Sequence, residues 1–202
     1  MTLVKICGVT SIADAVMASE AGADAIGLNF HPASPRCVTP ETAAAIAAAL
    51  PARVWRVGVF VDLPRAAVAD IAAQVGLDVL QFHGSEPAED CGGWGQRSIK
   101  AVRVRGPGAL LAAAGYPVDF ILADAYVAGA AGGTGQRVPL EWLTGMDKRR
   151  LLLAGGLNPD NVADVVRQVR PAGVDVASGV ERAPGVKDAE KVKRFIDHAK
   201  SA

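Results

Sequence analysis

The sequence predicts a single (β/α)8 barrel with parallel strands, the architecture known as the TIM barrel. Short apolar runs rich in strand-forming residues alternate with alanine-rich helical patterns along the whole 202-residue chain. This alternation favours parallel strands that are joined by helical crossovers. Half of the residues are hydrophobic, which is enough to bury one sizeable core. Because such a barrel needs about 200 residues at the least, we expect short loops and one domain over residues 1–202.

Eight strands and five clear helices are expected in order along the chain. The strands are the apolar runs at residues 3–7, 25–30, 54–61, 79–83, 99–104, 120–124, 151–154 and 174–178. The helical patterns cover residues 11–21, 40–50, 64–75, 159–169 and 187–199. Pro40, Pro64 and Pro159 suit the first turn of a helix, where the missing N–H costs little. The connections after the fourth, fifth and sixth strands show weaker patterns, with at most a short helix in 86–93.

An open, doubly wound sheet would give the same alternation of strands and helices. Its usual dinucleotide-binding fingerprint, G-x-G-x-x-G after the first strand, is absent from this sequence. No linker, low-complexity tract or sharp change of composition divides the chain. We therefore favour the closed barrel.

Charge and cysteine content narrow the class of partner. Lys+Arg and Asp+Glu number 21 each, with no basic stripe, so the charge favours a small-molecule partner over nucleic acid. No apolar run has the length of a signal peptide or of a membrane span. Cys7, Cys37 and Cys91 lie far apart without metal-site spacing, which suits free thiols in a reducing compartment. We expect a cytoplasmic protein with no metal site and no membrane partner.

Residues that can do chemistry gather where the predicted strands end. The active sites of these barrels are built at the C-terminal ends of the strands. Cys7 ends the first strand, and Arg36 lies in a loop after the second strand. His83 and Asp124 end the fourth and sixth strands. Elements scattered over the sequence would thus meet on one rim of the barrel.

Two glycine-containing turns follow the last two strands. They are Gly155-Gly156 and Ser178-Gly179. The loops after strands seven and eight frequently form a phosphate site in these barrels, because glycine lets backbone N–H groups approach an anion. Either turn alone could be only a tight connection, but the presence of both favours a phosphate site.

Cys7 is a candidate nucleophile or base. Alternation along the strand places Lys5 and Cys7 on one face, which we expect to line the barrel interior. A nearby ammonium group would favour the thiolate and lower the pKa of the thiol. Two plainer interpretations stay open: Cys7 could be a small buried apolar residue, and Lys5 could be a structural charge paired with Asp175 on the eighth strand.

The remaining polar candidates also have two interpretations each. Asp124 at the barrel mouth could donate a proton or only cap the next loop. Arg36, between prolines, could hold a carboxylate through two hydrogen bonds or be solvated. His83 has no second ligand in pattern, so packing or hydrogen bonding is favoured over metal binding. The glycine-rich loop at 129–135 could be a lid or only a flexible connection.

Seven short motifs, taken in their order along the chain, indicate a specific protein family. They are KICG at 5–8, SPR at 34–36, VGVF at 57–60, QFHG at 81–84, GGTG at 132–135, LAGGLNP at 153–159 and VDVASGVE at 174–181. Together they resemble the phosphoribosylanthranilate isomerases of tryptophan biosynthesis, and the match runs from the first strand to the last.

The resemblance implies a barrel enzyme without a cofactor that carries out an Amadori rearrangement of a phosphorylated sugar derivative. Carried over by motif, Cys7 is the general base and Asp124 the general acid. Arg36 matches the residue that pairs with the anthranilate carboxylate, while His83 and Asp175 match residues near the substrate. The turns at Gly155, Gly156, Ser178 and Gly179 match the phosphate site. The expected assembly is a monomer or a homodimer.

Three alternatives remain at this point. A metal-dependent sugar-phosphate epimerase would need histidine ligands, and the chain has three histidines in all. The aminoaldose-ketose isomerase of the histidine pathway is expected to use two aspartates, whereas the first strand here ends in Cys7. A barrel that only binds phosphate compounds would leave the pairing of Cys7 with Asp124 unexplained.

Overall fold

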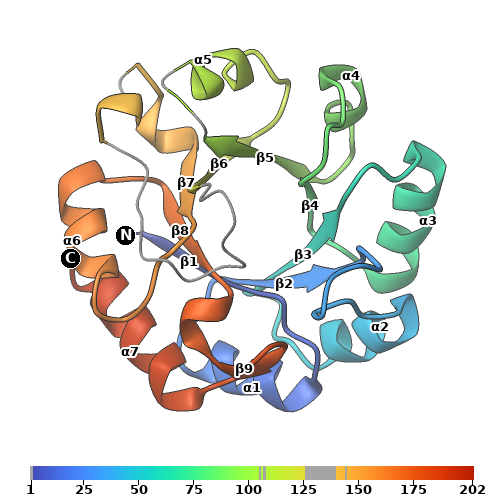
Figure 1. Cartoon of the computed structure of the whole chain (residues 1–202). Coiled ribbons are helices and arrows are strands. Elements are labelled where there is room, and N and C mark those ends of the chain that lie inside the picture. Colours follow the sequence, from blue (N-terminus) through green and yellow to red (C-terminus); the bar gives the residue numbers. More distant parts are fainter. Residues whose placement is uncertain (1, 105, 107, 126–139, 144) are drawn as a thin grey trace.

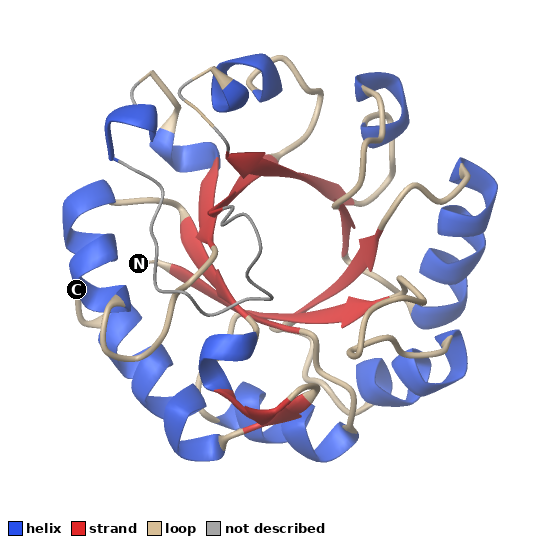
Figure 2. Ribbon diagram, in the orientation of Figure 1, coloured by secondary structure: helices blue, strands red, loops and turns tan. Residues whose placement is uncertain are grey.

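The computed structural model contains a closed barrel of eight parallel strands, in the order β1 to β8, with helices around it (Figure 1). It describes residues 2–202 except 105, 107, 126–139 and 144. Coloured by secondary structure, the strands form an inner ring and the helices an outer one (Figure 2). The predicted (β/α)8 barrel is therefore confirmed. The predicted lid at 129–135 lies outside the described residues.

The barrel strands are short, and their bounds follow the chain order. They are β1 Leu3–Cys7, β2 Ala25–Asn29, β3 Trp55–Phe60, β4 Val79–Phe82, β5 Arg97–Val104, β6 Phe120–Ala125, β7 Leu151–Ala154 and β8 Gly173–Val176. The α-helices are α1 Ile12–Glu20, α2 Pro40–Ala48, α3 Arg65–Val75, α4 Ala88–Cys91, α5 Ala109–Ala113, α6 Val162–Val169 and α7 Ala189–Lys200. Short 3-10 helices occupy Leu140–Leu143, Lys148–Arg150 and Ser178–Val180. None of the helices in the described part of the chain is long and apolar enough to cross a membrane.

Local sequence signals account for the starts of α1 and α2. Ser11 caps α1 by accepting a hydrogen bond from the backbone N–H of Asp14, and Thr39 caps α2, in which Pro40 is the first residue. The helix predicted at 159–169 begins later, at Val162. The reason is that the Asn161 side chain is used by the preceding turn, where it accepts from the backbone N–H of Asn158 and donates to the Gly156 carbonyl.

The C-terminal segment differs from the prediction. Residue 187 was expected to begin a helix, but Lys187 lies in a small antiparallel hairpin of β9, Glu181–Ala183, and β10, Val186–Lys187. The last helix begins after Asp188, whose side chain accepts from the backbone N–H of Lys191. The hairpin forms because the Lys187 ammonium group is buried at the end of β1, an interaction that helical periodicity does not reveal.

Side-chain alternation divides the core into two parts. One cluster lies inside the barrel and consists of Ala25, Val57, Val79, Ile99, Ala101, Leu122 and Leu152. A larger cluster packs the outer face of the strands against the helices. Towards the C-terminal ends of the strands the inward positions become polar, at Lys5, Gln81 and Asp175, all of which are buried. The polar residues of the interior therefore lie at the end where the loops form the mouth of the barrel.

Candidate active site

Strands β8, β1 and β2 build one side of the mouth around Cys7. Lys5 Nζ donates to Asp175 Oδ1 at 2.8 Å, and the two residues are register partners on adjacent strands. The predicted Lys5–Asp175 pair is thus present, and it is buried. Cys7 is two residues further along β1 and partly exposed. On β2, a Cβ atom at Gly27 would lie 2.8 Å from Cys7 Sγ and 3.1 Å from Lys5 Nζ, so both groups lie over this glycine.

The surroundings of Cys7 act on its proton in opposite directions. Burial raises the pKa of the Cys7 thiol above its ordinary value, and the ammonium of Lys5 offsets part of that effect. Burial lowers the pKa of Lys5, but its ion pair with Asp175 outweighs this, so the pKa of Lys5 ends above its ordinary value. Lys5 therefore remains charged, and the resting state of Cys7 at neutral pH is the thiol.

Arg36 reaches the same side of the mouth from the loop after β2. Its stem passes over Gly8, the residue that follows Cys7. Its Nε and Nη2 atoms donate to the two carboxylate oxygens of Glu181, at 2.8 and 2.6 Å. Lys187 donates to the same carboxylate at 2.8 Å. Arg36 is therefore held in place by an ion network rather than solvated.

Strands β4 and β6 supply the other polar group of the mouth. His83 Nε2 lies 3.5 Å from Asp124 Oδ2, and both side chains are partly exposed. Behind the histidine, Gln81 Nε2 is 3.0 Å from His83 Nδ1. With the amide nitrogen as donor, Nδ1 is an acceptor, so the ring proton lies on Nε2 and faces Asp124. Within the described part of the chain, the buried Gln81 Oε1 has no hydrogen-bond partner.

The two glycine-containing turns lie beside each other after β7 and β8. Gly155 and Gly156 both have positive φ, of 79° and 66°, which glycine adopts without strain. A Cβ at Gly179 would collide with the carbonyl oxygen of Leu157, so the turns are in contact. Four backbone N–H groups of these turns donate no hydrogen bond to any of the described residues; they belong to Gly155, Gly156, Ser178 and Gly179. These donors are available to an anion.

A sequence model of the N-(5'phosphoribosyl)anthranilate (PRA) isomerase family matches residues 4–198. The chain belongs to this family. A relative from Geobacter sp. (strain M21), named N-(5'-phosphoribosyl)anthranilate isomerase, is 50% identical over 201 residues, which are 99% of this chain and 98% of the relative. As a member of the PRA isomerase family the chain is an isomerase, and the resemblance found in the sequence is confirmed.

Two solved structures of the family have the same fold over 100% of both chains. A phosphoribosyl anthranilate isomerase in complex with reduced 1-(o-carboxyphenylamino)-1-deoxyribulose 5-phosphate is 40% identical, with a TM-score of 0.87. A structure of monomers of the dimeric enzyme from Thermotoga maritima is 39% identical, with a TM-score of 0.88.

Three charged residues at the mouth of this family member received no role from the sequence. Glu181 ends the VDVASGVE motif at 174–181, but its partner Arg36 is 145 residues away in the chain, so no local sequence pattern connects the two residues. Lys187 was placed in a helix. Arg103 follows Ile99 and Ala101 on the inward face of β5 and is the register partner of Asp124. Strand alternation could have found Arg103; no local signal indicates the other two.

The close approach at Gly27 leads to the first prediction. In Gly27→Ala the added methyl group must displace Cys7 Sγ and Lys5 Nζ. If Cys7 acts in the reaction, kcat should fall about ten- to hundredfold, because small displacements of a reacting group are costly, and the free energy of unfolding should fall by about 1–3 kcal/mol from overpacking. Steady-state kinetics and thermal unfolding measure both effects. The matched control is Gly95→Ala, where a Cβ meets no atom of the described residues within 4 Å; a Gly27→Ala variant that behaves like it would contradict the crowding argument.

Proposed function

We propose that this chain catalyses the Amadori rearrangement of N-(5'-phosphoribosyl)anthranilate to 1-(2-carboxyphenylamino)-1-deoxyribulose 5-phosphate in tryptophan biosynthesis. The observation that carries the proposal is the composition of the mouth. It holds a thiol on β1, a carboxyl group on β6, an arginine in the loop after β2 and, after β7 and β8, N–H donors that pair with no acceptor among the described residues. A relative is solved with a reduced form of the product named here, which has a carboxylate and a phosphate.

The first step assigns the acid to Asp124. Its carboxyl group gives a proton to the ring oxygen of the sugar, the bond from C1' to that oxygen breaks, and the amine nitrogen forms a double bond to C1'. His83 lies 3.5 Å from Asp124. Its Nε2–H is placed to stabilise the carboxylate that remains after the proton has left.

The second step assigns the base to Cys7. Its thiolate removes the proton from C2', the electron pair forms a double bond between C1' and C2', and the nitrogen recovers its lone pair. The resulting enolamine becomes the ketone when C1' gains a proton and the C2' hydroxyl loses one. Lys5, fixed by Asp175 at 2.8 Å, supplies the positive charge that favours the thiolate at the moment of transfer.

Two anchors hold the substrate between these groups. Arg36 binds the anthranilate carboxylate, and the N–H groups of Gly155, Gly156, Ser178 and Gly179 bind the phosphate. Asp175 and His83 line the sugar between the two ends. Because the substrate is held at its carboxylate and at its phosphate, its sugar carbons are positioned next to the acid and the base. Binding energy thus serves to orient the reacting atoms.

The test is an assay with freshly prepared N-(5'-phosphoribosyl)anthranilate. We expect its fluorescence to fall on addition of the protein, while chromatography shows the isomeric ketose accumulating. The acid and the base are both side chains, so the activity should survive exhaustive treatment with a chelator. A protein that binds the compound without converting it would support the non-catalytic alternative, and activity lost on chelation would support a metal-dependent enzyme.

The proposal extends to the setting of the reaction. We propose one catalytic domain over residues 1–202, a cytoplasmic location, and a monomer or homodimer. The name of the Thermotoga maritima relative describes a dimeric enzyme, which supports the second form. Light scattering after size exclusion distinguishes one copy from two.

Replacing Arg36 tests the carboxylate anchor. In Arg36→Met we expect KM to rise at least about tenfold with little change in kcat, because the carboxylate is remote from the reacting carbons. The matched control is Arg182→Met, an exposed arginine next to Glu181 on β9. An Arg36→Met variant with unchanged KM and a collapsed kcat would remove the anchor role.

A further inference from the structure

Glu181 is the centre of a buried ion network at the mouth. It is 8% exposed, and its carboxylate accepts hydrogen bonds from Arg36 and from Lys187. Lys187 is 2% exposed and also donates to the backbone carbonyls of Cys7, at 2.6 Å, and Ala177, at 3.2 Å. The network therefore joins the ends of β1 and β8 to the loop after β2. The reaction steps proposed above use neither Glu181 nor Lys187.

The geometry of the guanidinium group shows what this network leaves open. A guanidinium group can form two parallel hydrogen bonds along the edge that holds Nε, or along the end that holds the two Nη atoms. Glu181 occupies the first edge of Arg36, through Nε and Nη2. In the described part of the chain, Arg36 Nη1 makes no hydrogen bond. The end of the guanidinium group is therefore oriented by Glu181 and remains open to a second carboxylate.

Lys187 keeps Glu181 ionised and anchored. Burial on its own raises the pKa of Glu181, but the hydrogen bonds from Arg36 and Lys187 outweigh it and bring the pKa below its ordinary value. Arg36, Glu181 and Lys187 together carry one net positive charge. That charge suits an anionic ligand, whereas Arg36 and Lys187 without Glu181 would repel each other across the same space.

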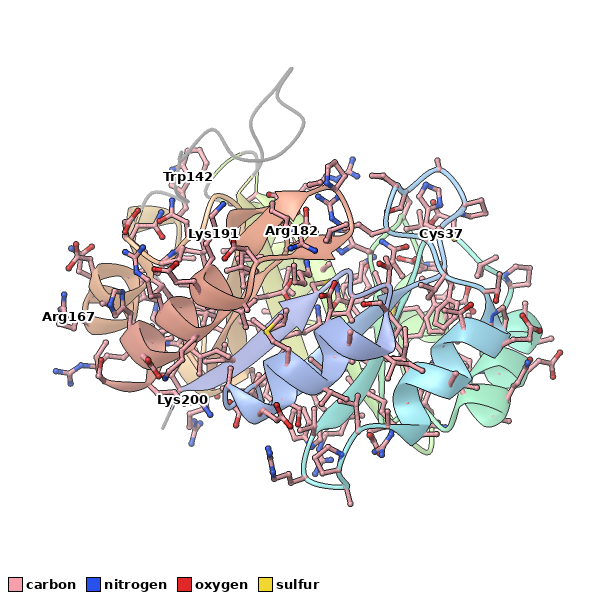
Figure 3. All side chains as sticks on the ribbon, turned by 90° about the horizontal axis from the view of Figure 1, so that it is seen from below. Cys37, Trp142, Arg167, Arg182, Lys191 and Lys200 are labelled. Carbon is pink, nitrogen blue, oxygen red and sulfur yellow. The ribbon has the colours of Figure 1, made fainter. Side chains whose placement is uncertain are left out.

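The hairpin places the network on the correct edge of the barrel. In the side view, Arg182 of β9 and Cys37 of the loop after β2 lie on one edge, and Lys200 at the end of α7 lies towards the other (Figure 3). Arg182 directly follows Glu181 in the chain, and Cys37 directly follows Arg36. The hairpin and the loop thus meet above the strand ends.

We propose that Glu181 is a positioning residue that fixes the edge of Arg36 and thereby aims its free end at the carboxylate of the substrate. This inference rests on the proposed function, since the carboxylate belongs to the proposed substrate. Lys187 ties the aimed arginine to the strand end that holds Cys7. The position of Arg36, the carboxylate anchor, is therefore fixed relative to Cys7, the base.

The test compares Glu181→Gln on two substrates. One is N-(5'-phosphoribosyl)anthranilate, and the other is N-(5'-phosphoribosyl)aniline, which lacks the carboxylate. We expect kcat/KM to fall about tenfold on the first, chiefly through KM, because a charge-assisted pair loses its orientation. On the aniline compound the change should be less than about twofold, since that substrate does not use Arg36. In an Arg36→Met background, Glu181→Gln should have no further effect on the anthranilate substrate.

Controls separate positioning from general damage. Glu190→Gln makes the same substitution at an exposed site in the first turn of α7 and should change neither substrate's kinetics. If Glu181→Gln does not fold, Glu181→Asp keeps the charge for Lys187, shortens the reach to Arg36, and should show the same selective loss. Equal losses on both substrates, or no loss on either, would overturn the inference. A wild-type chain that converts neither compound would instead overturn the proposed reaction, and the inference with it.

Discussion

The Cys7→Ala variant is expected to lose at least about a hundredfold in kcat, because removal of a general base typically costs that much or more. The fold should survive, since the side chain is small, partly exposed and at the end of β1. Binding of inorganic phosphate should also persist, because its proposed site lies after β7 and β8. Cys7→Ser should be very weak as well, because a hydroxyl is ionised far less easily than a thiol.

The pH profile gives the same prediction a second readout. The reacting form has Cys7 ionised and Asp124 protonated, so kcat/KM depends on the ionisation of both groups. Burial raises the pKa of the thiol, while Lys5 and Lys187 oppose this rise and Asp175 adds to it. Ionisation of the thiol should therefore fall on the alkaline side of neutrality and set the alkaline limb of the profile, and at pH 7 only a few per cent of the free enzyme or less should be thiolate.

The outcome that contradicts this role is specific. A Cys7→Ala enzyme that keeps more than about a tenth of the wild-type rate would exclude Cys7 as the base. Retention of the alkaline limb in that variant would point to another group. The thermal unfolding temperature is the control, because a variant with a wild-type transition has lost chemistry rather than structure.

The sequence was most informative where strand periodicity and strand order alone decide which residues lie together. Alternation along a strand placed Lys5 and Cys7 on one face, and the closure of a parallel barrel placed Asp175 next to Lys5. The rule that barrel sites form at strand ends placed Cys7 and Asp124 at one mouth. These steps need only strand periodicity and strand order, which the alternation of apolar runs already contains.

The ion network could not be predicted in this way. The helical pattern at 187–199 includes Lys187, and only its burial against the carbonyl of Cys7 accounts for the hairpin. Glu181 begins β9 and Arg36 lies in the loop after β2, and the path of such a loop follows no periodicity. The contact of His83 with Asp124 joins strands that flank β5, so it depends on the reach of the side chains across the barrel mouth.

The Asp124→Asn variant is expected to be almost inactive, with kcat reduced at least about a hundredfold. Asparagine keeps the shape of the side chain and can still form hydrogen bonds, but it cannot deliver a proton to the ring oxygen. The wild-type kcat/KM profile should be bell-shaped, because activity needs the carboxyl group protonated and the thiol ionised, and its limits belong to the pair. In the variant the limb that reports the acid should vanish together with most of the rate.

Steady-state kinetics over a range of pH, with thermal unfolding as the control for structure, measure this prediction. Asp124 is partly exposed and lies near His83, so its replacement should leave the fold intact. Near-normal activity with both limbs preserved would leave Asp124 as a loop cap only. The acid would then have to come from elsewhere on the rim, and Asp175 would be the first candidate, although its carboxylate is already engaged by Lys5 at 2.8 Å. Because Asp175 Oδ1 already accepts a hydrogen bond from the Lys5 ammonium group, it is poorly placed to donate a proton to the substrate, which is the physical reason to expect the result at Asp124 instead.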